Sequence, residues 1–104
     1  MSESIIINEL RIMAHTIVPS EGTVILFGSR ARGTASDESD WDILIILDKN
    51  QITKEDYDSI CYPFDKFGWE MNTVINPIVY TRNKWNASKH TLFYKNVMKE
   101  GIIL

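Results

Sequence analysis

The first hydrophobic pattern along the chain is helical. Between Glu3 and about Val18, apolar residues recur at the i, i+3, i+4, i+7 spacing of an amphipathic helix. Ser2 stands where an N-cap is expected, and the polar, Pro- and Gly-containing residues 19–22 end the pattern. The apolar face of this helix is predicted to consist of Ile6, Ile7, Leu10, Met13, Ala14 and Ile17.

Three later segments have the pattern of strands. Thr23–Phe27 (TVILF) is a short apolar run of the buried type, and Asp42–Asp48 (DILIILD) is apolar throughout its middle. A strand that is apolar on both faces belongs at the centre of a sheet covered by helices. A third strand is predicted within Glu70–Tyr80, where Pro77 indicates an edge position or a bulge.

Helices are predicted between and after these strands. A short helix across Arg30–Arg32 is expected to close at Gly33 and to lead into a polar loop over residues 34–40. Thr53 begins a capping box for a helix that runs to about Phe67, with a break or kink around Tyr62 because Pro63 follows. A last helix is predicted over residues 88–100, with Gly101 as its end and a buried stripe of Leu92, Phe93, Val97 and Met98.

The predicted order of elements is α-β-α-β-α-β-α, which indicates an α/β (α+β) fold with a small sheet backed by helices. A chain of 104 residues fits one domain over residues 1–104, and neither repeats nor linkers interrupt it.

Composition narrows the possible partners. The chain is 44% hydrophobic and 24% charged, with a formal net charge of −3 and scattered basic residues. Duplex nucleic-acid binding needs clustered cations and is therefore not expected. No apolar run approaches the ~20 residues of a membrane span, and the N-terminus has no basic leader, so a cytoplasmic protein without membrane contact is expected.

The first candidate chemistry lies where the strand Thr23–Phe27 ends. Gly28 permits a sharp turn and close approach of a ligand to the backbone, and the N–H groups that open the next helix favour an anion. The Ser29 hydroxyl adds a donor for a phosphate at the same point. Arg30 and Arg32 are either phosphate contacts or ordinary surface cations.

The second candidate is a pair of carboxylates. Asp40 and Asp42 stand at positions i and i+2, which project from the same face of a strand. Two adjacent carboxylates repel each other unless a cation such as Mg²⁺ binds between them. With two ions ~3.5–4 Å apart, such a pair supports in-line attack at phosphorus. Gly-Ser and Asp-x-Asp are each common in ordinary turns, so the prediction depends on their combination.

This combination resembles a known signature. The stretch FGSRARGTASDESDWDILI is similar to the pattern G-S-x-A-x-G-x-x-x-x-x-S-D-x-D-[LI] of the DNA polymerase beta-like nucleotidyltransferases, above all their minimal, single-domain branch. The order of elements and the segments NPIVYTRNKW and FYKNVMKEGIIL extend the resemblance over most of the chain. The resemblance implies a mixed sheet backed by helices and transfer of a nucleoside monophosphate, AMP above all, from an NTP with Mg²⁺. It assigns nucleotide binding to Gly28 and Ser29, and metal binding to Asp40 and Asp42.

This sequence departs from the family pattern at one catalytic position. Active members of the family supply a third catalytic carboxylate from the next strand, and the nearest positions here are expected to be Asn72, Thr73 and Val74. Glu70 is the one acidic residue close by and is the candidate substitute for this catalytic role.

Two functions follow from these observations. The first is an enzyme that transfers a nucleotide from an NTP, expected to be ATP, to a protein or small-molecule acceptor. The alternative is a weakly catalytic or non-catalytic binding module, similar to the antitoxins that pair with a helical HEPN-type protein. The partner is then such a protein or a second copy of the chain, and Trp69, Trp85, Phe93 and Tyr94 are candidate contacts.

Overall fold

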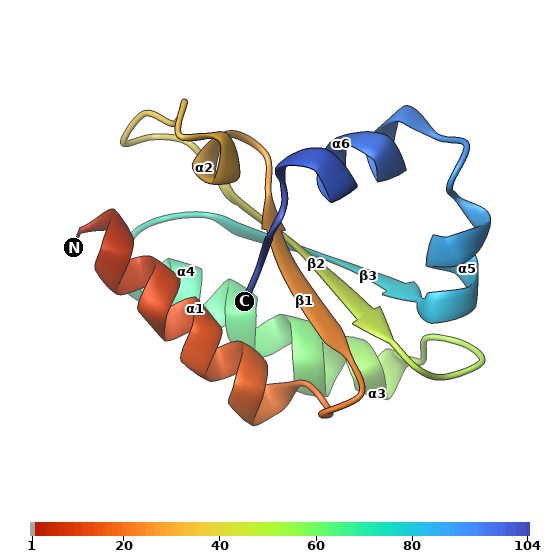
Figure 1. Ribbon diagram of the computed structural model, residues 1–104. Coiled ribbons are helices and arrows are strands. Elements are labelled where there is room, and N and C mark those ends of the chain that lie inside the picture. Colours follow the sequence, from red (N-terminus) through yellow and green to blue (C-terminus); the bar gives the residue numbers. More distant parts are fainter. Residues whose placement is uncertain (1) are drawn as a thin grey trace.

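A four-stranded mixed sheet runs through the centre of the computed structural model, which describes residues 2–104 (Figure 1). The strands stand in the order β3-β2-β1-β4. β1 pairs antiparallel with both β2 and β4, whereas β2 and β3 are parallel. The bounds are Thr23–Phe27 for β1, Trp41–Leu47 for β2, Ile75–Thr81 for β3 and Ile102–Ile103 for β4.

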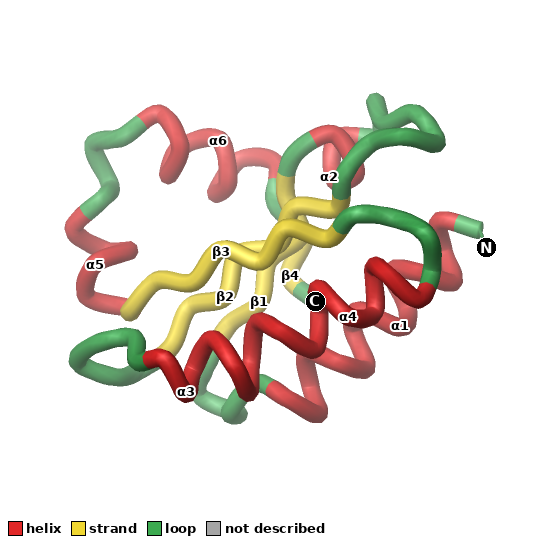
Figure 2. The backbone as a smooth tube through the Cα atoms, turned by 180° about the vertical axis from the view of Figure 1, so that it is seen from behind, coloured by secondary structure: helices red, strands yellow, loops and turns green. Residues whose placement is uncertain are grey.

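Helices cover both faces of this sheet (Figures 1 and 2). One face carries α1 (Glu3–Ile17), α3 (Lys54–Asp56) and α4 (Tyr62–Glu70), and the other carries α5 (Arg82–Ala87) and α6 (Leu92–Glu100). Each face therefore has its own hydrophobic core. The α/β prediction with a helix-backed mixed sheet is confirmed.

The central strand is β2, as its two-sided apolar pattern predicts. Ile43 and Ile45 pack into the core beneath α1 and α4, while Leu44 and Ile46 pack into the core beneath α5 and α6. All four side chains are essentially inaccessible to solvent. Burial on both faces fixes the pairing register of this strand, because a shift by one residue would move every side chain to the opposite face of the sheet.

The N-terminal helix agrees with its periodicity. The Ser2 hydroxyl accepts a hydrogen bond from the Ile5 N–H, and Ile6, Leu10 and Ala14 are buried against the sheet. Beyond Gly22 the chain enters β1 with the predicted bounds.

The helix after Thr53 continues without a break to Glu70, three residues beyond the predicted end. Its middle turn, Tyr57–Cys61, is π-helical and directly precedes α4, in which Pro63 is the second residue. Proline lacks an N–H and its ring collides with the carbonyl four residues earlier, and a wider turn relieves both problems. The irregularity is thus at the predicted place, but it is a π-helical turn.

Of two predictions for the last third of the chain, one is partly confirmed and the other is wrong. The third strand, Ile75–Thr81, lies almost entirely within the predicted range, but Glu70 ends α4 and is not part of the strand. The predicted last helix over residues 88–100 is only Leu92–Glu100, with Thr91 as its N-cap, and a separate helix α5 precedes it. Pro77 does lie on an edge strand, since β3 stands at the end of the strand order.

The buried stripe of α6 also differs from the prediction. Val97 is buried and Phe93 packs against the same core, but Leu92 is 72% exposed and Met98 is 58% exposed. Tyr94 takes part instead, stacking in a tilted arrangement on the buried Trp85 of α5. Aromatic packing against α5 rotates the helix away from the predicted face.

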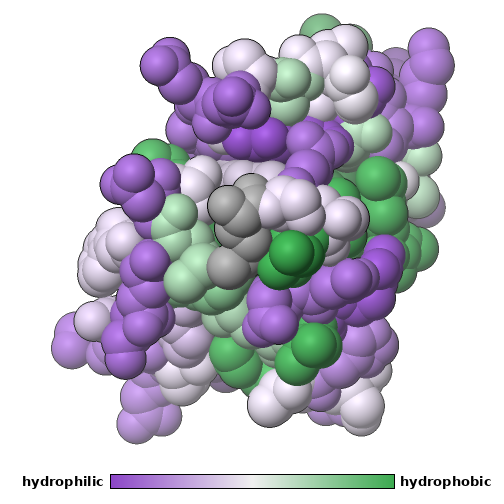
Figure 3. Space-filling model, turned by 90° about the vertical axis from the view of Figure 1, so that its left-hand side faces the viewer, coloured by the Kyte–Doolittle hydropathy of each residue, from purple (hydrophilic) through white to green (hydrophobic). Residues whose placement is uncertain are grey.

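The surface between these elements is mixed. On the side shown in Figure 3, hydrophobic residues are interspersed with hydrophilic ones. Across residues 2–104, no helix combines the length and the apolar character that crossing a membrane requires.

The capping box at Thr53 makes stability depend on pH. Asp56 is buried, its carboxylate accepts the Thr53 N–H at 2.8 Å, and it pairs with Lys49 at 2.7 Å. The hydrogen bond from Lys49, followed by that from the Thr53 backbone, holds the pKa of Asp56 below its ordinary value. We predict that Asp56→Asn lowers the free energy of unfolding at pH 7 by about 1–2 kcal/mol.

This difference from wild type should shrink as the pH falls below about 4, because a carboxyl group with a lowered folded-state pKa loses its stabilising charge on protonation. Urea unfolding at several pH values measures it. A stability difference that stays constant down to pH 3 would contradict this account.

Candidate functional site

The two carboxylates lie where the end of β1 meets the start of β2. The antiparallel register pairs Phe27 with Asp42, so the turn at Gly28 lies directly beside that aspartate. Asp42 is partly buried within the strand, and Asp40 precedes the strand and is exposed. Both predicted metal-binding residues are therefore brought to the predicted phosphate-binding turn.

Gly28 is required by the backbone and by its neighbour. Its dihedral angles, φ 76° and ψ −159°, belong to a backbone region that residues other than glycine avoid. A Cβ atom at this position would stand 2.5 Å from Asp42 Oδ2. The turn and the carboxylate are thus packed together, as a site for a shared ligand requires.

The short helix α2 (Ser29–Arg32) begins at this turn and ends at Gly33, as predicted. The Gly28 carbonyl accepts hydrogen bonds from the Ala31 and Arg32 N–H groups. Ser29 is the first residue of this helix and follows Gly28, which lies against Asp42. Both predicted phosphate-binding residues therefore lie beside the two aspartates, and we call the site of Gly28, Ser29, Asp40 and Asp42 the carboxylate corner.

Asn76 is the site residue that sequence reasoning missed. It pairs with Asp42 in the parallel β2–β3 register, and its Nδ2 donates to Asp40 Oδ2 at 3.0 Å and to Asp42 Oδ1 at 3.2 Å. The predicted positions, Asn72, Thr73 and Val74, precede β3 and are not in it. A signal was present, because Ile75-Asn76-Pro77 repeats the apolar–polar–apolar pattern of Trp41-Asp42-Ile43.

Glu70 has no comparable place. It ends α4, in the helical layer on the other face of the sheet, and no hydrogen bond joins it to Asp40 or Asp42. Among residues 2–104, no group of three or more His, Cys, Asp or Glu side chains could hold a metal ion. The two carboxylates supply oxygen ligands of the kind Mg²⁺ takes, while the Asn76 NH₂ group faces these carboxylates as a donor.

Arg30 and Arg32 lie on opposite sides of the sheet. The buried Arg30 guanidinium is 4.4 Å from the ring centre of Trp41, donates to the Ser39 carbonyl at 2.9 Å and pairs with Glu3 at 3.2 Å. Trp41 packs into the core beneath α1, opposite the face of Asp42. Arg30 therefore fixes the loop that precedes the carboxylates.

Arg32 is exposed and lies on the α6 side. It forms an ion pair with Glu100 at 3.2 Å and lines a cavity of about 210 Å³ beside Gly28. Phe27 and Phe93 supply the aromatic wall of this cavity, with ring centres 5.4 Å apart, and Asn96 supplies an amide. Arg32 is thus the arginine whose position suits a ligand held at Gly28.

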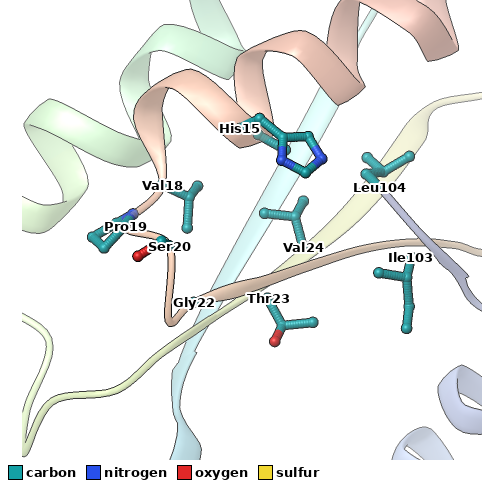
Figure 4. A pocket seen from close by; sticks show the side chains of 10 residues that line it. His15, Val18, Pro19, Ser20, Gly22, Thr23, Val24, Ile103 and Leu104 are labelled. Atoms are coloured by element: carbon teal, nitrogen blue, oxygen red, sulfur yellow. The ribbon is translucent and has the colours of Figure 1, made fainter.

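A different cavity lies at the far end of β1 (Figure 4). It measures about 270 Å³ and is lined by residues such as His15, Val24 and Leu104. No acidic side chain lines it, and Thr23 and Val24 stand at the opposite end of β1 from Gly28. It is therefore separate from the carboxylate corner.

The amino-acid sequence of the chain is similar to those of known nucleotidyltransferases. Residues 8–104 match the family model of the nucleotidyltransferase domain. MJ0604 of Methanocaldococcus jannaschii, which bears the provisional name protein adenylyltransferase, is 38% identical over 78% of this chain and 75% of its own. MJ0141 of the same organism, provisionally named likewise, is 37% identical over 57% of this chain and 59% of its own.

Solved structures share the fold. A crystal structure of a toxin–antitoxin with AMP-PNP superposes with a TM-score of 0.65 at 17% identity, covering 99% of this chain and 72% of the other. A mutant of the toxin–antitoxin MntA-HpeT gives a TM-score of 0.61 at 18% identity, covering 93% of this chain and 69% of the other.

The two glycines of positive φ offer a matched pair of variants. Gly33 has φ 78°, but nothing lies within 4 Å of a Cβ atom added there. We predict that Gly33→Ala costs about 1 kcal/mol of stability from backbone strain alone. Gly28→Ala should in addition displace the Asp42 carboxylate and weaken Mn²⁺ and ATP binding at least about tenfold.

Thermal unfolding and calorimetric titration of both variants measure the two effects separately. Equal loss of ligand binding in Gly28→Ala and Gly33→Ala would show that the contact with Asp42 has no special role.

Proposed function

The chain belongs to the nucleotidyltransferase domain family, and on that basis we propose that it binds ATP with Mg²⁺ and transfers AMP to a hydroxyl group of a partner protein. The observation that carries this proposal is the convergence of Asp40 and Asp42 on the turn at Gly28 and Ser29. The names of the two related proteins, which specify adenylyl transfer to protein, favour AMP and a protein acceptor.

Each residue of the corner has a role in this proposal. Gly28 lets the triphosphate approach the backbone, and the N–H groups and hydroxyl that open α2 bind its oxygens. Asp40 and Asp42 would hold the cation, which would supply positive charge to the phosphate oxygens. Arg32, on the same side of the sheet, is the cation available to the phosphates, whereas Arg30 holds the loop.

The reaction itself is a displacement at the α-phosphorus. The acceptor oxygen forms a bond to this atom while the bond to the β-phosphate oxygen breaks, and pyrophosphate leaves. The acceptor hydroxyl must also lose its proton, which passes to water because Asn76 has no basic group at neutral pH that could receive it. We therefore expect slower transfer than a corner with a third carboxylate would give.

The absence of that carboxylate favours a second candidate function. The amide of Asn76 at the position paired with Asp42 is compatible with a weakly catalytic antitoxin that silences a HEPN-type partner by binding it. Folds of this kind occur in the toxin–antitoxin structures that superpose on this chain. Of the four aromatic residues considered as partner contacts, Trp69 is 67% exposed, whereas Trp85 is buried and Phe93 and Tyr94 pack against it.

One experiment separates the two functions. The chain is incubated with ATP labelled at the α-phosphate, Mg²⁺ and a candidate HEPN-type partner protein, and label on that protein is measured. We predict transfer by wild type and a loss of at least about 100-fold in Asp40→Asn/Asp42→Asn, because the cation contributes several kcal/mol to the transition state.

Asp37→Asn/Glu38→Gln is the matched control, since it removes the same charge from exposed positions of the same loop and should retain transfer. If wild type transfers nothing but still binds and silences the partner, the enzyme proposal is wrong and the antitoxin-like function stands.

A further inference from the structure

Asn76 is the one side chain, within residues 2–104, that bonds to both carboxylates of the corner. Its place is fixed by the parallel register of β3 on β2, which sets it directly opposite Asp42 on the same face of the sheet. The next residue, Pro77, has no N–H, and it lies on an edge strand where none is needed. The amide is therefore positioned by the sheet itself.

The two carboxylates depend on Asn76 to different degrees. Asp42 is held on both sides, because one oxygen accepts from Asn76 and the other lies against Gly28. Asp40 is exposed, and no other side chain of the described residues bonds to it. Without Asn76, the Asp40 side chain would be free to turn toward solvent, away from the like charge of Asp42.

The chemistry of the amide suits this task. Its NH₂ group has two donors, so it can satisfy two anions at once, and hydrogen bonds to charged acceptors are the stronger kind. An aspartate of the same shape would have no donor at neutral pH and would add a third negative charge. Asparagine thus stabilises the pair in the absence of a cation, and aspartate would require one.

We propose that Asn76 is a positioning residue, which holds Asp40 and Asp42 together before a cation binds and limits the corner to the charge of two carboxylates. The corner then binds one divalent cation in the absence of nucleotide, since two carboxylates balance its charge. This proposal rests on the proposed metal site, but it concerns how that site is preorganised.

The test compares two substitutions that differ in charge. Asn76→Leu removes the donors without adding charge, and Asn76→Asp removes the donors and adds a carboxylate. Both should lower the midpoint of thermal unfolding by several degrees in metal-free buffer at pH 7. Asn83→Asp, the same change at an exposed position beyond the other end of β3, should leave the midpoint unchanged.

Mn²⁺ titration by calorimetry should then separate the variants. Asn76→Leu should bind Mn²⁺ about 10- to 100-fold more weakly than wild type, as expected when a partner of metal ligands is lost. Asn76→Asp should bind it at least about tenfold more tightly and should regain its thermal midpoint when Mn²⁺ is added, because a third carboxylate increases the ligand charge.

The effect of Mn²⁺ on the thermal midpoint distinguishes charge repulsion from altered packing. A midpoint of Asn76→Asp that stays low when Mn²⁺ is added would indicate packing alone and would overturn the proposal. Unchanged Mn²⁺ affinity in both Asn76 variants would overturn it as well.

These readouts do not use nucleotide transfer. If the Mn²⁺ and thermal results hold while the chain transfers no AMP, the proposed enzyme function fails and the role of Asn76 stands. If wild type transfers AMP but the Asn76 variants bind Mn²⁺ as wild type does, the role of Asn76 fails alone.

Discussion

The pairing of Phe27 with Asp42 is the contact on which the functional corner depends. It brings the turn after one strand against the first residues of the next, so that the groups suited to phosphate and to a cation lie side by side. The contact is close enough to exclude any side chain at Gly28, whose missing Cβ leaves room for the Asp42 carboxylate. The fold of the rest of the chain holds this pairing in place.

The strand β2 places functional and structural side chains on opposite faces of the sheet. Because alternate residues of a strand point to opposite faces, Asp42 faces the α5 and α6 side while Trp41 lies in the core beneath α1. Arg30 packs over Trp41 and binds the Ser39 carbonyl, which fixes the loop just before Asp40. An arginine that the motif places beside the phosphates thus supports the carboxylates from the opposite side of the sheet.

The charge of the corner links its structure to both proposed functions. Two carboxylates bridged by an amide form a stable arrangement without metal, which a third carboxylate would not. The same amide provides no base for the acceptor hydroxyl. In the proposed enzyme function, a corner of this kind would bind a nucleotide and a cation but would transfer slowly, because it holds no base.

The sequence by itself determined the elements whose signals are local: the capped helix α1, the capping box at Thr53, the two-sided apolar strand β2 and the turn at Gly28 with its paired aspartates. Helix periodicity, caps and glycine turns depend on neighbours a few residues apart, which explains why they can be read directly. The tertiary structure alone decided that Asn76 bridges the carboxylates, that Glu70 belongs to a helix, and that α6 packs Tyr94 instead of Leu92 against the core. These outcomes depend on the register between β2 and β3 and on aromatic packing between α5 and α6, which join residues far apart in the chain.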